Sequence, residues 1–210
     1  MWRKIAFITF IIVFAFGILF TSILRTAAVR YEFKGTTNNT ANRVLGDRTV
    51  NIDYYLAYPG KILPDSPLWP LKAARDRVWF WLTTNPSRKA ELLLLFADKR
   101  LSGSQVLFEK GKADVGFSTL TKGEKYLEEA AQLEKENRGK GINTTEFLTR
   151  LAKGSLKHFD VMEEILTVAP EDAKPDIIKT QDFAKRIYND SKNALLEKGI
   201  EPPENPFNWN

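Results

Sequence analysis

The sequence predicts an all-α protein, in which an N-terminal transmembrane helix is followed by an antiparallel four-helix bundle with one extra Trp-rich helix. Residues 5–24, IAFITFIIVFAFGILFTSIL, contain no charged residue. Twenty helical residues span ~30 Å, the hydrocarbon thickness of a bilayer. Four later segments carry apolar residues at helical spacing. Short connections separate them, and short connections join antiparallel neighbours.

The apolar run 5–24 is interpreted as an uncleaved single-pass anchor. It is longer than the ~7–15 apolar residues of a signal peptide, although the small residues after Arg25 keep a cleaved signal peptide as the alternative. Basic residues are nearly balanced on its two sides, so they do not decide its orientation. A short tail before a long C-terminal domain is usual for a signal anchor. We therefore expect a cell-membrane protein whose C-terminal domain is extracytoplasmic.

Four regions follow from this organisation. Residues 1–28 form the anchor, and residues 29–52 form a stalk, because FKGTTNNTANRVLGDRT has no sustained apolar period. Residues 53–199 form the bundle domain. Residues 200–210, IEPPENPFNWN, form a polar tail rich in proline.

Capping signals predict the starts of the first two helices of the domain, and a third helix follows them. Ser66 followed by proline predicts a helix to about Leu82, and Asn85 followed by proline predicts a second helix to about Gly111. The third helix is expected at 113–137. The second and third segments present apolar residues on one face, as bundle helices do.

Similar signals predict the last two helices. Asn143 and Glu146 have the spacing of a capping box, which opens a helix that reaches Ala169. The final helix is opened by prolines and closed by a glycine at the C′ position. These residues are Pro170, Pro175 and Gly199.

The chain offers little for catalysis or for a cofactor. It has one histidine and no cysteine, whereas serine or cysteine triads need a histidine base and zinc sites need several His or Cys ligands. No haem motif or glycine-rich phosphate loop occurs. We expect no enzymatic activity, no metal and no cofactor. The net charge of +5 favours anionic headgroups or wall polymers, and no motif points to nucleic acid.

Seven aromatic residues precede or lie in the Trp-rich helix, and they have two interpretations. They either cap the bundle core or form a surface for a sugar polymer or the membrane interface. Charged residues on the same helix favour the core-facing interpretation. The aromatic residues are Tyr54, Tyr55, Tyr58, Trp69, Trp79, Phe80 and Trp81, and the charged ones are Lys72, Arg75, Asp76 and Arg77.

One polar site is predicted inside the bundle. Residues equidistant from the turn of an antiparallel hairpin lie at the same level, which places Arg100, Glu124, His158 and Arg186 in one layer. The layer is either a buried network that fixes helix register or a pocket for a small anion or metabolite, clamped by two guanidinium groups. The structural interpretation is favoured. Glu134 is expected at the surface.

The run PGKILPDSPLWPLKAARDRVWFWLTTNP, followed by ADKRL, TKGEKY, SLKH and DFAKR, resembles an uncharacterised bacterial family of membrane-anchored helical domains. The family signature is PG-x-LPDSP-x-Y-x-LK, typical of candidate-phylum bacteria. The similarity covers about residues 54–190, with an inserted Lys61 and with Trp69 in place of the tyrosine. The resemblance implies the fold and an envelope location, but no activity.

Two functions are therefore compatible with the sequence. The first is a non-enzymatic, membrane-tethered module that binds a protein or a cell-envelope component. The second is a sensor or carrier of a small ligand that uses the polar layer in the bundle core.

Overall fold

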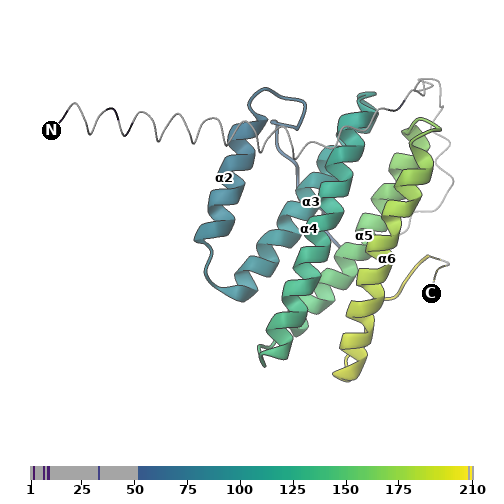
Figure 1. The fold of residues 1–210 in the computed structure, drawn as a ribbon. Coiled ribbons are helices and arrows are strands. Elements are labelled where there is room, and N and C mark those ends of the chain that lie inside the picture. The colour runs from purple at the N-terminus through teal and green to yellow at the C-terminus, as the bar shows by residue number, and fades with distance from the viewer. Residues whose placement is uncertain are drawn as a thin grey trace. The chain divides into compact units, whose positions relative to one another are not determined.

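The computed structural model describes residues 52–207 together with Trp2, Phe7, Thr9, Phe33 and Trp209. Residues 52–207 contain five helices and no strand, which confirms the all-helical prediction for this part of the chain (Figure 1). The helices are α2 (Trp69–Leu82), α3 (Pro86–Glu109), α4 (Ala113–Gly139), α5 (Thr145–Val168) and α6 (Lys174–Glu197).

Most of the predicted anchor lies outside the described residues. None of the helices that the structure describes is both long enough and apolar enough to cross a membrane. Residues 1–31 and residues 32–210 form separate compact units, and the second unit contains all five helices.

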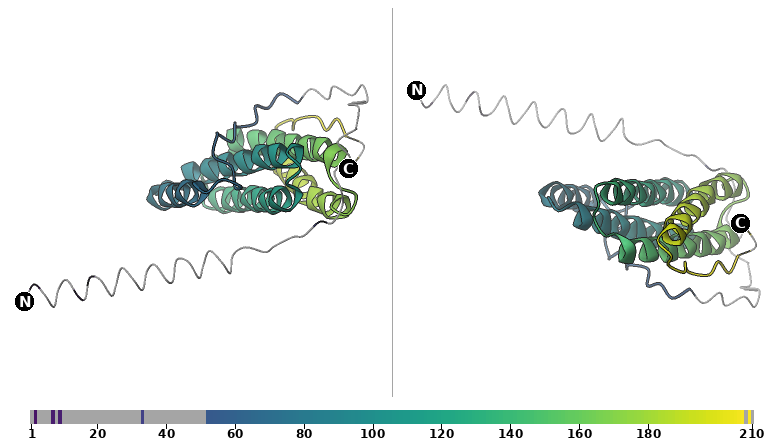
Figure 2. Two further views of the ribbon diagram at one scale, coloured as in Figure 1. Left: turned by 90° about the horizontal axis from the view of Figure 1, so that it is seen from above. Right: turned by 90° about the horizontal axis from the view of Figure 1, so that it is seen from below.

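Helices α3 to α6 form a bundle in which each helix runs antiparallel to the next (Figure 1). The most extensive packing joins α3 to α4 and α5 to α6, and α3 also packs on α5. One apolar cluster joins Leu93, Ala97, Leu127 and Leu151 from three of these helices. Helix α2 lies at the outer edge of the bundle, beside α3 (Figure 2).

Local capping explains several helix limits. The Asn85 side chain accepts a hydrogen bond from the backbone N–H of Arg88 at 3.1 Å, which confirms the predicted start of α3. Helices α3, α4 and α6 each end before a glycine with positive φ, at Gly111, Gly141 and Gly199. These glycines and the residues after them donate hydrogen bonds back to the last helical turn, as in the Schellman motif.

The first helix begins later than predicted. Helix α2 starts at Trp69, and Pro70 occupies its first turn. The Ser66 hydroxyl accepts a hydrogen bond from the Leu68 N–H at 3.3 Å, so Ser66 stabilises the turn before the helix and does not cap it.

The predicted capping box of α5 does not form. The Asn143 side chain accepts from the Thr145 N–H at 3.2 Å in a local turn, and Thr144 is the N-cap residue. The Thr144 hydroxyl donates instead to the Glu134 carboxylate on α4 at 2.6 Å, and Arg138 also donates to it. Glu134 is only 2% exposed. Its expected surface position was therefore wrong, because a tertiary contact binds it.

Residues 52–68, which we call the strap, cross α3 and α5 before entering α2. Ser102 of α3 donates to the Ala57 carbonyl at 2.9 Å. Lys153 of α5 pairs with Asp53 at 2.7 Å. Lys112, at the α3–α4 turn, pairs with Asp65 at 2.7 Å. The strap is thus fixed to the bundle along its length.

The C-terminal tail also packs on the bundle. The Tyr188 hydroxyl of α6 donates to the Pro203 carbonyl at 2.8 Å. The Phe207 and Trp209 rings lie 4.6 and 5.2 Å from the Phe159 ring of α5, measured between centroids. The polar, proline-rich composition of residues 200–210 did not predict this packing.

The core-facing interpretation of the aromatic residues holds for only part of the set. Tyr54, Trp69 and Phe80 are partly buried. Tyr55 is 85% exposed and Trp81 is 77% exposed. Tyr58 and Trp79 are also exposed. The charged residues of α2 did not predict which face it turns to the bundle, because both faces carry apolar side chains.

Candidate functional site

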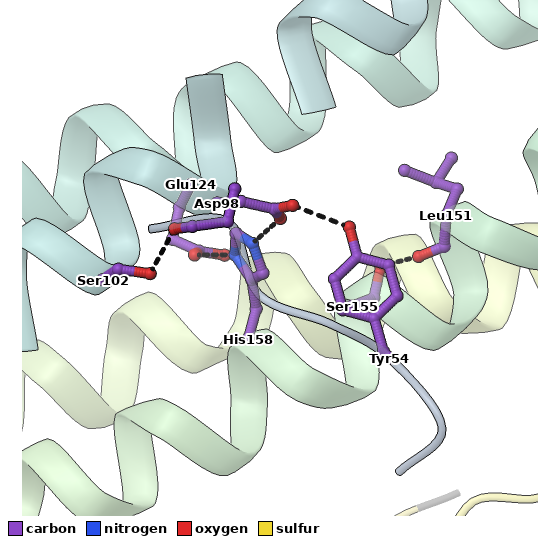
Figure 3. Close-up of polar contacts among 8 residues, drawn as sticks. Tyr54, Asp98, Ser102, Glu124, Leu151, Ser155 and His158 are labelled. Atoms are coloured by element: carbon purple, nitrogen blue, oxygen red, sulfur yellow. Dashed lines mark hydrogen bonds and ion pairs between the residues drawn. The ribbon is translucent and has the colours of Figure 1, made fainter. Parts of the chain in front are cut away.

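The bundle core contains a network of ionisable side chains from three helices (Figure 3). His158 of α5 is completely buried. Its Nδ1 atom lies 2.7 Å from Glu124 Oε1 on α4, and its Nε2 atom lies 3.1 Å from Asp98 Oδ1 on α3. One imidazole therefore links α3, α4 and α5.

The strap adds a fourth member. The Tyr54 hydroxyl donates to Asp98 Oδ2 at 2.9 Å, so each Asp98 oxygen has a partner (Figure 3). The Tyr54 ring packs on Gly154 of α5. A Cβ atom at Gly154 would lie only 3.2 Å from the Tyr54 ring, so the ring would have to move by a few tenths of an ångström to admit one.

The carboxylates control the charge of the imidazole. Burial alone lowers the pKa of His158, but the Glu124 charge and the hydrogen bonds to Asp98 and Glu124 together raise that pKa from 6.5 to about 9. His158 is therefore an imidazolium at neutral pH, with both ring N–H groups donating to carboxylates. Burial, followed by the negative charge of Asp98, raises the pKa of Tyr54, so its phenol remains a hydrogen-bond donor.

Among the four residues of the network, Glu124 depends most on a single partner, His158. Its side chain is completely buried, and its Oε2 atom has no hydrogen-bond partner among the described residues. A buried carboxylate is costly unless it is paired. The charge of Glu124 is therefore stabilised mainly by the His158 ring.

The structure brings together only two of the four residues predicted for the polar layer, Glu124 and His158. Arg100 turns away, and its guanidinium lies 4.2 Å from the centre of the Trp69 ring. Asp98 and Tyr54 lie beside His158 instead. Arg100 follows Asp98 by two positions, which is about 200° around a helix, so it lies on a different face.

Arg186 is also absent from the network. It is exposed on α6, pairs with Glu128 of α4, and lies over the Phe183 ring at 5.1 Å. The predicted layer of four residues is therefore corrected to a network of Tyr54, Asp98, Glu124 and His158. The predicted clamp of two guanidinium groups is not formed.

The neighbouring hydroxyl groups stabilise the backbone around the network. The Ser155 hydroxyl, one turn before His158, donates to the Leu151 carbonyl within α5 at 2.8 Å (Figure 3). Ser102 holds the strap through Ala57. Both hydroxyls donate to backbone carbonyls, and neither is paired with the imidazole.

A groove of about 610 Å³ lies between the strap, α3 and α5. Leu94, Leu95 and Ala57 supply part of its apolar lining, and the Asp98 and Tyr54 side chains border it. Its charged residues form ion pairs across it or beside it, Arg150–Glu91 at 3.2 Å and Lys153–Asp53 at 2.7 Å. The groove thus combines an apolar lining with a rim of both charges.

Chemically, the network is suited to holding helices together. Within the part of the chain that the structure describes, no cluster of three His, Cys, Asp or Glu side chains could hold a metal ion. His158 is sealed from solvent, and both of its ring nitrogens are engaged. The network fixes Tyr54, and Tyr54 in turn fixes one wall of the groove.

Comparison with known proteins assigns the chain to a family. No curated protein and no solved structure matches it. A family model described as a domain of unknown function, DUF5667, matches residues 61–172, which extend from the strap to the turn between α5 and α6 and include Asp98, Glu124 and His158. Because this match covers more than half of the chain, the protein belongs to the DUF5667 family, whose function is unknown.

Proposed function

We propose that this protein is a membrane-tethered, extracytoplasmic helical module that acts by binding, without catalysis. Its partner is a protein or a cell-envelope component, of which one segment occupies the groove between the strap, α3 and α5. The uncharged run 5–24 supports the tether, since its length matches a bilayer.

The observation that carries the proposal is the preformed groove. Its apolar lining and charged rim resemble a protein–protein interface, in which an apolar centre is surrounded by polar groups. The Tyr54–Asp98 hydrogen bond and the Asp53–Lys153 ion pair hold the strap in place. A rigid surface loses little conformational entropy when a partner binds.

The small-ligand alternative has less support. It required Arg100 and Arg186 to clamp an anion inside the bundle. Arg100 instead stacks on Trp69, and Arg186 pairs with Glu128 at the surface. The groove therefore supports the binding module better than a ligand sensor.

The orientation is tested with a reporter that is active only outside the cytoplasm, fused after Asn210. We expect reporter activity and retention of the full-length chain in the membrane fraction. An inactive reporter on a membrane-bound chain would contradict the orientation. A shortened, released product would contradict the anchor.

The groove is tested by photo-crosslinking in cells that naturally make the protein. A photoreactive phenylalanine analogue replaces Leu95 in the groove, and the matched control replaces Leu196, an exposed leucine on α6. We expect a discrete adduct from position 95 that is absent from position 196. Equal adducts from both positions, or none from position 95, would contradict binding in the groove.

A further inference from the structure

Helix α2 presents a second apolar surface, on the side that faces away from the bundle. Trp69 and Phe80 on its inner side are partly buried, and Asp76 is buried. Its outer side has large apolar side chains that are all more than half exposed. These residues, which we call the outer face of α2, are Leu68, Leu71, Val78, Trp81 and Leu82.

We infer that the outer face of α2 lies on the surface of an anionic lipid bilayer. This inference rests on the proposed membrane tether. Helix α2 would then lie parallel to the bilayer surface and make a second contact between the chain and the membrane. This contact is separate from the groove.

The residues of α2 resemble those of a helix that lies in the membrane interface. Arg75 and Arg77 are exposed. At 100° per residue, Arg77 lies beside Trp81 at one border of the outer face. Arg75, which also pairs with Asp76, lies between Leu82 and Leu68. Helices that lie in the membrane interface combine tryptophan and aliphatic side chains with basic residues that reach the lipid headgroups. The arginines can reach lipid phosphates while the apolar side chains enter the acyl boundary.

Only a short length of chain separates the proposed anchor from the bundle. The Phe33 N–H donates to Asp114 at 2.6 Å, and its ring packs edge-on against Phe117 at 5.4 Å. The chain thus contacts the first turns of α4 only nine residues after Leu24, where the uncharged run ends. Nine residues span at most ~32 Å, so the length of the chain limits how far Phe33 can lie from the end of the proposed anchor.

The start of α2 lies at the same end of the bundle. Asp65, four residues before α2, pairs with Lys112, the residue before α4, at 2.7 Å. A helix of 14 residues is ~21 Å long. The outer face is therefore within reach of the bilayer that would hold the anchor.

A second copy of the chain fits this surface less well. One helix face of this length covers on the order of 200 Å² in projection, whereas a stable interface buries ~800 Å² on each partner. A symmetric pairing would also bring the arginines of two copies close together. Like charges oppose such pairing, while anionic lipid favours the same arginines.

The absence of cysteine makes a direct test possible, because a single introduced cysteine carries the only label. The full chain is placed in nanodiscs of phosphatidylglycerol and phosphatidylcholine, with a minor lipid that bears a nitroxide near the headgroup. An environment-sensitive fluorophore is attached to Val78→Cys on the outer face. The matched control is Leu196→Cys, since Val78 and Leu196 are 54% and 52% exposed.

We expect nitroxide quenching to be several-fold greater at position 78 than at position 196. It should fall by about half or more when Arg75 and Arg77 are both replaced by glutamate, or when phosphatidylglycerol is omitted. Arg75 also pairs with the buried Asp76 at 2.6 Å, so the far-ultraviolet spectrum of the double variant must be unchanged for its quenching to count. Omission of phosphatidylglycerol repeats the test without any substitution.

Three outcomes would overturn the inference. Equal quenching at both positions, in a chain that co-purifies with the discs, would reject the lipid contact and leave the tether intact. Energy transfer between labels at position 78 on different copies, without lipid quenching, would identify a second copy as the occupant. A chain that elutes apart from the discs would reject the tether, and the lipid contact with it.

Discussion

The stability of the bundle should depend on pH through its single histidine. The pKa of His158 is about 9 in the folded chain and 6.5 in the unfolded reference. A group whose pKa rises on folding stabilises the fold in its protonated form. This stabilisation is complete below pH 6.5 and is lost as the pH rises through about 9.

The size of the effect follows from the same values. A rise of about 2.5 units, at ~1.4 kcal/mol per unit, corresponds to about 3 kcal/mol of unfolding free energy. For a domain of this size, each kcal/mol shifts the melting temperature by ~2–4 °C. The melting temperature should therefore fall by roughly 6–12 °C between pH 6 and pH 9.5 because of His158 alone.

The assay is thermal and urea unfolding of the full chain in detergent, followed by circular dichroism across this pH range. The comparison is His158→Gln, which has no titrating ring but faces the same Asp98, Glu124 and Tyr54 side chains. Lysine, tyrosine and α-amino groups titrate in both proteins, so the difference between the two curves reports the buried network around His158. Parallel curves, or a wild-type stability that is flat from pH 6.5 to pH 9, would refute the buried imidazolium.

Four further substitutions test individual contacts, each by urea unfolding. Tyr54→Phe removes the donor to Asp98 and should cost ~1–3 kcal/mol. Gly154→Ala places a methyl group 3.2 Å from the Tyr54 ring and should cost ~1–3 kcal/mol. Trp209→Ala removes a half-buried ring from the α5–α6 surface and should cost ~2 kcal/mol. Glu134→Ala leaves a buried hydroxyl without its acceptor and should cost ~1–3 kcal/mol.

Matched controls separate these effects from general sensitivity to substitution. Glu109→Ala, at an exposed glutamate near the end of α3, should change stability by less than ~0.5 kcal/mol. Gly154→Ala should cost much less in a Tyr54→Ala background, because the ring that it contacts is gone. An equal cost of Gly154→Ala in both backgrounds would show that the contact with the Tyr54 ring is unimportant. If Glu134→Ala leaves the free energy of unfolding unchanged, the Thr144–Glu134 hydrogen bond does not stabilise the fold.

The sequence predicted helices most accurately where the signal was local. Asn85 caps α3 with its own side chain, and Gly199 closes α6 with a backbone conformation that glycine adopts easily. The start of α5 was mispredicted because the Thr144 hydroxyl binds Glu134, ten residues away on another helix. Such a partner becomes identifiable only once the helices are packed.

Only Glu124 and His158 of the candidate site were predicted, because the face on which a side chain lies also depends on how the helices pack. Equal spacing from the turns indicates the level of a residue along the bundle, and it paired Glu124 with His158. It does not indicate the face of the helix. Asp98 follows Leu94 by four positions and precedes Leu101 by three, which places it on a buried face. That signal was present in the sequence and would have selected Asp98 instead of Arg100.

The amino-acid composition of the C-terminal tail did not predict which of its side chains pack on the bundle. Residues 200–207 contain prolines and acidic residues that predict exposure. The two aromatic rings at positions 207 and 209 nevertheless pack together with Phe159. Their burial depends on a surface that α5 and α6 form only together, so no local pattern could reveal it.

Asp98 and Glu124 share the imidazole of His158, and this limits how the three positions can vary among related proteins. Loss of His158 alone leaves two buried carboxylates without their cation, and loss of Asp98 or Glu124 alone leaves one N–H of the buried ring without its acceptor. Each single loss is destabilising because a buried group loses its partner. Replacement of all three by apolar side chains of similar volume removes every charge at once and is often tolerated. The three positions should therefore covary across the family: relatives retain the complete set or have replaced the complete set, and intermediates are rare.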